Sequence, residues 1–337
     1  MTVLITGVAG FIANHLAYRL LEDGAEVVGI DNMSPYYDVT LKHARLQRLE
    51  RFERFTPLVF DLCDGDRLEA AFADTAPDIV LHLAAQPGVR YSLEAPEVYV
   101  QSNLVGFANL LEACRKHPPR HVIYASSSSV YGANRALPSS EHAHTDHPLT
   151  LYAASKKANE VMAHSYSHLF GLVITGVRFF TVYGEWGRPD MAFFKFTDAI
   201  LNGRPMDVYN QGKMSRDFTY VADVVEAVTR LIGHPPQLDE TWDPHAPDPA
   251  SSGVAPYRVF NIGNSKPVPL MTYIDLLQDA LGKKAQINFT EMQPGEVQDT
   301  WADTHDLTAL IGYAPATPVE TGIANFVTWY KTYYGID

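Results

Sequence analysis

A tyrosine and a lysine lie four residues apart in the stretch TLYAASKKANE, residues 150–160. In a helix, Tyr152 and Lys156 would share one face, because side chains at positions i and i+4 are neighbours on its surface. An ammonium group beside a phenol stabilises the phenolate and lowers its pKa from about 10. The pair could then act as a general base near neutral pH. A surface pair on an amphipathic helix would have the same spacing, so the surrounding sequence must decide.

Serine hydroxyls precede this pair in the stretch YASSSSVYG, residues 124–132. Ser126 to Ser129 follow an apolar run that predicts a strand. A serine at a strand end can hydrogen-bond the same substrate oxygen as the tyrosine. A solvent-exposed loop would also explain four serines in a row.

The first 31 residues predict a nucleotide-binding unit. Residues 3–6 read as a strand, a glycine turn and an apolar-spaced helix follow, and residues 26–30 read as a second strand. Gly7, Gly10 and Ala13 match the G-x-x-G-x-x-G/A variant of the dinucleotide fingerprint. Gly7 permits a tight turn, Gly10 lets the backbone approach a pyrophosphate at the helix N-terminus, and Ala13 keeps the helix close to the sheet.

An acidic residue ends the second predicted strand. Asp31 would hold the ribose 2′-hydroxyl and repel a 2′-phosphate. No arginine follows it directly. The sequence therefore predicts NAD as cofactor in preference to NADP.

Strand and helix patterns continue to alternate along the chain. Further strands are expected at 55–62, ending at Asp61 and Leu62, at 77–85, ending at Leu83 to Ala85, at 120–129 and at 172–180, with helices at 66–73, 98–116 and 153–168. Nearly continuous apolar strands joined by helices predict an α/β fold with a doubly wound parallel (Rossmann) sheet. Ligands bind beyond the carboxyl ends of such strands, where the polar clusters fall.

Composition excludes several classes of protein. The 337 residues suit one large or two smaller domains, and their formal net charge of −13 argues against nucleic-acid binding. Cys63 and Cys114 form no CxxC or Cys/His cluster, so neither a disulfide framework nor a metal site is expected. No apolar run reaches the roughly 20 residues of a membrane span, and no signal peptide is evident. These features predict a cytoplasmic protein without a membrane segment.

The fingerprint, Asp31, the serine run and the Tyr152/Lys156 pair occur in an order that resembles the extended short-chain dehydrogenase/reductases. The likeness covers nearly the whole chain and is greatest to nucleotide-sugar epimerases of the UDP-glucuronate 4-epimerase branch. It is carried by TGVAGFIA, DNMSPYYD, LAAQPGVRYS, SSSSVYG, LYAASKKANE, RFFTVYGEWGRPDMA, SRDFTYVADVVEA and FNIGN.

The resemblance implies a role for each catalytic candidate. Tyr152 would remove the proton of the sugar 4-hydroxyl while a hydride passes from C4 to NAD, Ser127 and Ser128 would help bind that oxygen, and Lys156 would bind the nicotinamide ribose. The 4-keto sugar would rotate about its diphosphate and be reduced on its other face, so NAD would remain bound. Cofactor contacts are then expected from Gly7, Gly10, Phe11, Ile12, Asp31, Asn32, Asp61, Leu62, Leu83, Ala84, Ala85, Tyr152, Lys156 and Phe179.

Substrate contacts follow from the same resemblance. Arg216 would contact the diphosphate of a UDP-sugar, and Gln293 stands where galactose epimerases often place another phosphate-binding arginine. Thr181 and Arg188 occupy positions that handle the carboxylate of a uronate, and Arg90 adds a candidate contact. The serine run supplies Ser126, Ser127 and Ser128.

Related enzymes differ at the serine run. Dehydratases carry an Asp-Glu pair at the positions of Ser128 and Ser129, and decarboxylases carry a glutamate at the position of Ser129, where this chain has only hydroxyls. A UDP-glucose/UDP-galactose-type 4-epimerase, a net oxidoreductase that releases its cofactor and a non-catalytic NAD-binding protein remain alternatives.

The motifs also predict how the chain is organised. Residues 1–178, joined by about 218–263, are expected to form the NAD-binding domain, and residues 179–217 and 264–337 a smaller α/β substrate domain. Residues 234–253, rich in proline, aspartate and serine, read as a long exposed loop. Apolar residues in the helices at 98–116 and 153–168 exceed what one sheet face needs, and in the family these helices pair across a homodimer.

Overall fold

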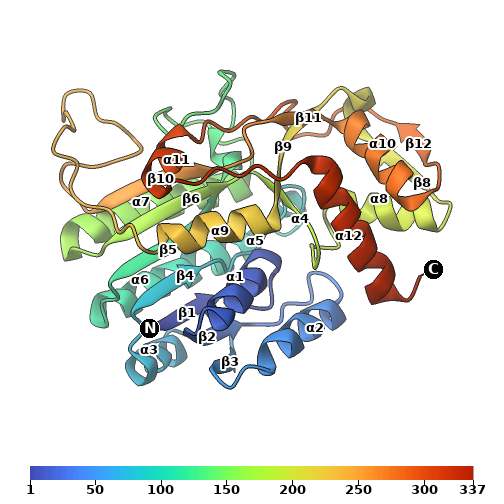
Figure 1. Cartoon of the computed structure of the whole chain (residues 1–337). Helices are drawn as coiled ribbons and strands as arrows, with labels where there is room; N and C mark the ends of the chain where they lie inside the picture. Colours follow the sequence, from blue (N-terminus) through green and yellow to red (C-terminus); the bar gives the residue numbers. More distant parts are fainter. Residues whose placement is uncertain (337) are drawn as a thin grey trace.

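Seven parallel strands form the central sheet of the computed structural model, which describes residues 1–336 (Figure 1). Their order is β10-β6-β5-β4-β1-β2-β3. The predicted doubly wound α/β fold is confirmed. The strands are β1 (Thr2–Thr6), β2 (Glu26–Asp31), β3 (Phe55–Val59), β4 (Ile79–His82), β5 (His121–Ser127), β6 (Ile174–Phe179) and β10 (Tyr257–Ile262).

The strand order reverses between β1 and β4, so the ligand crevice of such a sheet is expected there. Thr6, the last residue of β1, pairs with His82, the last of β4. The glycine turn and the residues after His82 therefore leave the sheet side by side. Strands β3 and β4 end earlier than predicted because their neighbours end too: Val59 pairs with Asp31, the last residue of β2.

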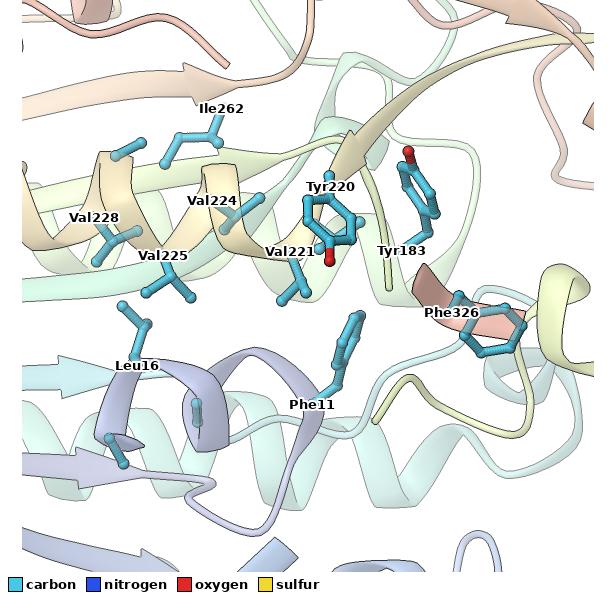
Figure 2. Packing of buried hydrophobic residues seen from close by; sticks show 14 of the residues in the cluster. Phe11, Leu16, Tyr183, Tyr220, Val221, Val224, Val225, Val228, Ile262 and Phe326 are labelled. Atoms are coloured by element: carbon cyan, nitrogen blue, oxygen red, sulfur yellow. The ribbon is translucent and has the colours of Figure 1, made fainter. Parts of the chain in front are cut away.

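Helices cover both faces of this sheet. Alternate residues of β1 point into two different cores, Val3 and Ile5 into one and Leu4 into the other. Figure 2 shows the first core, where Leu16 faces Val225 and Val228. The helices that pack on the sheet are α1 (Phe11–Glu22), α2 (Val39–Glu50), α3 (Gly65–Thr75), α6 (Gly106–Lys116), α7 (Leu151–Phe170) and α9 (Val221–Leu231).

The helix expected at 98–116 is not regular. Its range holds the end of α5 (Pro96–Tyr99), a π-helical segment over Val100–Val105, and α6, and the short α4 (Tyr91–Glu94) precedes it. Within the π-helical segment Asn103 accepts from the Gln86 backbone amide at 2.8 Å and donates to Ser155 Oγ at 3.0 Å. These bonds join the segment after β4 to α7, and the wider helical turn is what places the Asn103 side chain between them.

A smaller part of the chain surrounds two further sheets, with order β11-β9-β7 and β12-β8 (Figure 1). The predicted return of the chain to the large sheet occurs through β10, whereas β9 pairs with β7 and β11 instead. The division into two domains stays a prediction. The elements here are β7 (Thr181–Tyr183), α8 (Ala192–Leu201), β8 (Pro205–Val208), β9 (Ser215–Tyr220), β11 (Pro267–Pro269), α10 (Leu270–Leu281), β12 (Gln286–Phe289), α11 (His305–Ile311) and α12 (Val319–Tyr334).

The segment predicted as an exposed loop, residues 234–253, contains no helix or named strand and is largely exposed. Its end differs from the prediction, because Ala250, Ser251 and Ser252 are buried. Ser251 also forms an isolated antiparallel β-bridge with Arg258 of β10. Among residues 1–336 there is no helix with the length and apolar character that crossing a membrane requires.

Candidate active site

One cleft, with a volume of about 1360 Å³, contains every residue that the sequence predicts for the site. It lies where the carboxyl ends of the central strands meet the smaller part of the chain. The lining includes the cofactor candidates Gly7, Gly10, Phe11, Ile12, Asp31, Asn32, Asp61, Leu62, Leu83, Ala84, Ala85 and Phe179, the pair Tyr152 and Lys156, and the substrate candidates Arg90, Ser126, Ser127, Ser128, Thr181, Arg188 and Arg216.

The glycine turn at the start of α1 forms one wall. Gly7 has φ +74°, and a Cβ there would lie 2.8 Å from the Ala84 amide nitrogen, so the loop after β4 passes too close for any side chain. Gly10 donates to Gly7 O at 2.7 Å, and its Cβ would lie 2.8 Å from that oxygen. The turn itself therefore needs Gly10, in addition to the pyrophosphate approach predicted for it. Helix α1 begins without a side-chain cap, which leaves its first amides open to an anion.

Asp31 is buried at the end of β2. Its carboxylate accepts from the backbone amides of Ala9 at 3.0 Å and Met33 at 2.8 Å. The ammonium of Lys42, on α2, lies 3.9 Å away. No arginine directly follows Asp31 in the sequence, but α2 folds back and brings the Lys42 cation close to it. Burial lowers the pKa of Lys42, and the charge of Asp31 partly opposes that shift.

Asn32 and Asp61 meet on the next part of this wall. Asn32 Nδ2 donates to Asp61 Oδ2 at 2.8 Å, and the Cys63 amide donates to Asp61 Oδ1 at 2.8 Å. Burial alone would raise the pKa of Asp61, but these hydrogen bonds lower it below its usual value. With the open N-terminus of α1 and the Asp31 carboxylate, this wall has the anion site and the hydroxyl acceptors that a dinucleotide needs.

Tyr152 lies in the first turn of α7, after the N-cap Thr150, whose hydroxyl accepts from the Ala153 amide at 3.2 Å. Burial raises the pKa of Tyr152, while the neighbouring Ser127 hydroxyl and the charge of Arg188 oppose the rise. The expectation that Lys156 lowers this pKa is not met. Lys156 Nζ donates instead to Ala125 O at 2.9 Å, at the end of β5, and burial lowers the lysine pKa to about 8.

The serine run places its hydroxyls in different directions. Ser127 is one of the groups that lower the pKa of Tyr152, and its oxygen accepts from the Ser129 amide at 3.2 Å. Ser128 starts the 3₁₀ turn over Ser128–Tyr131. The Ser126 hydroxyl donates to Glu160 Oε1 at 2.7 Å, and Glu160 is outside the cleft lining, although Ser126 itself lines the cleft. A substrate contact through the Ser126 hydroxyl is therefore disfavoured, because Glu160 already occupies it.

Arg188 reaches the cleft from the loop between β7 and α8. Asp190 binds two of its nitrogens, with Nε–Oδ1 at 3.0 Å and Nη2–Oδ2 at 2.5 Å. Among the described residues nothing hydrogen-bonds Nη1. Burial would lower the pKa of Arg188, but Asp190 raises it above its usual value, so the guanidinium stays charged.

The other two arginines are held by the segment 296–298. Arg90 Nε donates to Glu296 Oε1 at 3.0 Å, and its guanidinium lies 4.2 Å from the centre of the Tyr209 ring. Arg216 donates to the carbonyl oxygens of Val297 at 2.8 Å and Gln298 at 2.7 Å. Contact between Arg90 and a sugar carboxylate is thus in competition with Glu296.

Sequence reasoning missed several residues of the cleft. Lys42, Asp190 and Glu296 contact the predicted residues Asp31, Arg188 and Arg90, and Tyr36 bonds Asp190. Tyr36 and Asp190 lie within stretches that carried the family resemblance. The residues of this structure, 1–336, contain no group of three or more His, Cys, Asp or Glu side chains that could hold a metal ion.

Comparison with known proteins assigns the family. Residues 3–263 match the NAD dependent epimerase/dehydratase family. The chain belongs to this family. Its cofactor is therefore NAD, in agreement with the glycine turn and Asp31. The serine run and Tyr152 line the same cleft as the residues predicted to bind the cofactor and the substrate.

Known proteins match nearly the whole length of this chain. The chain is 52% identical to protein CapI of Staphylococcus aureus over 334 residues, covering 99% of each, and 46% identical to UDP-glucuronate 4-epimerase 1 of Arabidopsis thaliana over 340 residues, covering 99% of this chain and 78% of that protein. A crystal structure of UDP-glucuronic acid 4-epimerase from Bacillus cereus, in complex with UDP-glucuronic acid and NAD, is similar with a TM-score of 0.86 and 33% identity, covering 99% and 100% of the two chains.

Proposed function

We propose that this chain is an NAD-dependent isomerase that interconverts UDP-glucuronate and UDP-galacturonate by transient oxidation at C4. The observation that carries the proposal is the position of Arg188. Its charge acts on Tyr152 within the cleft, so one site offers a general base for a sugar hydroxyl and a cation for a nearby carboxylate. The two relatives named for UDP-glucuronate epimerisation support the choice of substrate.

Tyr152 and Ser127 would handle the reacting hydroxyl. Tyr152 would take the proton of the 4-hydroxyl and later return it, while the Ser127 hydroxyl, which lines the same cleft, would hold the same oxygen. Bound NAD would accept a hydride from C4 and give it back on the other face of the rotated 4-keto sugar. Lys156 of α7, whose ammonium bonds Ala125 O in β5, would hold the nicotinamide ribose. Asp31 and the amides of α1 would hold the other ribose and the pyrophosphate.

Arg188 and Thr181 would hold the sugar carboxylate. Oxidation at C4 makes the glucuronosyl group a β-keto acid. It loses CO₂ when the C–C bond to its carboxylate is perpendicular to the carbonyl plane. A hydrogen bond from the free Nη1 of Arg188 would keep the carboxylate charged and in plane. The serine run supports this outcome, because no carboxyl side chain occupies the positions of Ser128 and Ser129.

A UDP-glucose/UDP-galactose-type 4-epimerase is the second candidate. The Asp190 carboxylate neutralises much of the Arg188 charge. A neutral sugar would therefore leave little uncompensated positive charge in the site. Product analysis with both UDP-glucuronate and UDP-glucose separates the two candidates.

A homodimer and a cytoplasmic location complete the proposal. Val161, Leu169 and Phe170 of α7 are exposed, at 60%, 64% and 48%, which suits a second copy packing on this helix. Cys63 and Cys114 are free thiols, as in a reducing compartment. Light scattering of the purified protein tests the dimer.

The decisive experiment is incubation of purified protein with UDP-glucuronate and no added NAD, followed by chromatography of the nucleotides. UDP-galacturonate is expected, since the cofactor is regenerated in each turnover. Release of reduced cofactor in amounts equal to converted substrate would instead identify a net oxidoreductase. No conversion, with NAD present in the protein, would reject the uronate assignment.

A further inference from the structure

Arg45, on α2, is fully buried and forms no ion pair with a carboxylate anywhere in residues 1–336. Its guanidinium donates instead to oxygen atoms of two separate parts of the cleft wall. Nη1 donates to Ala9 O in the glycine turn at 2.9 Å and to the Tyr37 hydroxyl at 2.7 Å. Burying a cation without a counter-ion is costly, and these hydrogen bonds are what compensates it.

The other nitrogens of Arg45 hold the Arg188 loop, defined here as residues 184–190. Nη2 donates to Trp186 O at 2.6 Å and to Gly187 O at 2.9 Å, and Nε donates to Trp186 O at 3.1 Å. The two loop carbonyls that Arg45 binds therefore belong to the two residues immediately before Arg188. One side chain thus joins the glycine turn to the loop that carries the substrate-facing cation.

Trp186 shows that this loop is held in an unfavourable conformation. Its φ is +58°, a left-handed value that bulky residues rarely adopt. The indole packs on Trp329 and Tyr333 of α12, with ring centres 5.3 Å and 5.2 Å away, and the Arg48 guanidinium lies 4.6 Å from it. Such a conformation persists only where the surroundings determine it strongly, and Arg45 fixes its carbonyl.

Tyr36 reaches the same loop from the other end. Its hydroxyl lies 3.3 Å from Asp190 Oδ2, the oxygen that also accepts from Arg188 Nη2. The hydroxyl is packed against Gly88, where a Cβ would lie 2.6 Å from it. Tyr36 and Tyr37 belong to the DNMSPYYD stretch, so the segment that begins at Asp31 contacts the Arg188 loop directly through Tyr36 and indirectly through the bond between Tyr37 and Arg45.

We propose that Tyr36 and Arg45 are positioning residues that set the direction of Arg188 toward the sugar carboxylate, Tyr36 through Asp190 and Arg45 through the loop backbone. Two nitrogens of Arg188 are bound by Asp190, so the direction of Nη1 depends on where Asp190 and the loop are held. The inference rests on the proposed uronate function, because a neutral sugar has no group for Nη1 to bind.

Calorimetric binding to the full-length protein tests the inference, with UDP-glucuronate, UDP-glucose and UDP as probes. Tyr36→Phe should weaken binding of UDP-glucuronate by about tenfold, the effect of one misdirected hydrogen bond to a charged group, and leave UDP binding within about twofold. Arg45→Lys should act in the same direction. Tyr166→Phe is the matched control, since it removes a tyrosine–carboxylate bond of 2.7 Å to Glu112 outside the cleft.

A double-mutant cycle shows whether Tyr36 acts through Arg188. Adding Tyr36→Phe to Arg188→Ala should cause no further loss of UDP-glucuronate affinity, because the group being positioned is already absent. Additive losses, equal losses for UDP and UDP-glucuronate, or an unchanged UDP-glucuronate affinity in Tyr36→Phe would overturn the positioning role. Tyr36→Phe keeps the test valid if Arg45→Lys does not fold.

The proposed function can fail separately in the same experiment. If the wild-type protein binds UDP-glucuronate no more tightly than UDP-glucose, the uronate function is wrong and this inference is wrong with it. If the wild type prefers UDP-glucuronate and Tyr36→Phe keeps that preference, only the positioning role is rejected.

Discussion

Lys156 donates a hydrogen bond to the carbonyl oxygen of Ala125 at 2.9 Å, which ties α7 to the end of β5 immediately before the serine run. The lysine is therefore directed toward the strand end, whereas Ser127 and Arg188 are the groups that favour ionisation of Tyr152. This arrangement separates two roles that the spacing of Tyr152 and Lys156 had combined.

Tyr152→Phe should abolish turnover and leave NAD bound, because it removes the general base and keeps the other expected cofactor contacts. Loss of a general base typically lowers the rate by about 10²-fold or more. Chromatography of products and of cofactor released on denaturation measures both quantities. A variant with more than about a tenth of wild-type activity would exclude Tyr152 as the main base.

Lys156→Ala should lower both the rate and the amount of NAD that stays with the purified protein. The side chain is buried and would contact the nicotinamide ribose, and its removal also breaks the bond to Ala125 O. Lys157→Ala is a matched control from the next position, where the ammonium bonds Thr145 at 2.7 Å instead. Unchanged NAD content and rate in Lys156→Ala would reject its assigned role.

Asp31→Ala should relax the preference for NAD over NADP. The change removes the acid that repels a 2′-phosphate and frees Lys42, whose ammonium lies 3.9 Å from that carboxylate, to attract one. Asp31→Gly with Asn32→Arg should act in the same direction. Cofactor affinities measured by fluorescence titration test this. Adding Lys42→Met to Asp31→Ala should remove much of the gain for NADP. If discrimination is unchanged in both Asp31 variants, Asp31 is not the ribose ligand.

Arg188→Ala should raise the KM for UDP-glucuronate and change the fate of the 4-keto intermediate. A charge-assisted contact in a shielded site is worth about 1.5–3 kcal/mol. A carboxylate released from Arg188 can turn out of plane and leave as CO₂, so mass spectrometry should detect a 4-keto-pentose nucleotide. If the uronate epimer is the sole product, at a reduced rate, Arg188 has no role in fidelity and Thr181 or the serine run must hold the carboxylate.

Glu141→Gln should change how stability depends on pH. Burial raises the pKa of Glu141 from 4.5 to about 7, although its oxygens accept from the Asn261 amide at 3.2 Å and from Asn261 Nδ2 at 3.0 Å. A carboxyl whose folded pKa is raised stabilises the fold fully below pH 4.5 and loses that contribution as the pH rises through 7.

The loss in the wild type is at most about 3 kcal/mol across this window, and the amide of the glutamine variant does not ionise. Thermal unfolding from pH 4.5 to 8 should therefore show wild type losing stability relative to Glu141→Gln. Glu240→Gln, at an exposed position, is the control and should show no such trend. Parallel curves for wild type and Glu141→Gln would show that Glu141 does not titrate in this range.

Local patterns in the sequence determined much of this protein. The apolar runs, the glycine turn with Asp31 and the Tyr152/Lys156 pair all depend on neighbouring residues, because strand and helix periods act over a few positions. In the structure, every site residue predicted from the family motifs lines one cleft. Strand ends were less accurate, since β3 and β4 stop where their partner strands stop.

Only the tertiary structure decided which groups the site residues actually contact. Ser126 bonds Glu160, Lys42 lies beside Asp31, Arg90 pairs with Glu296, and Arg45 holds the Arg188 loop. Each contact joins elements that meet only when the sheet is assembled, and each depends on the direction of a long side chain over a distance of a few ångströms. Sequence spacing carries no information on those directions, because burial and hydrogen-bond geometry select them after the backbone has folded.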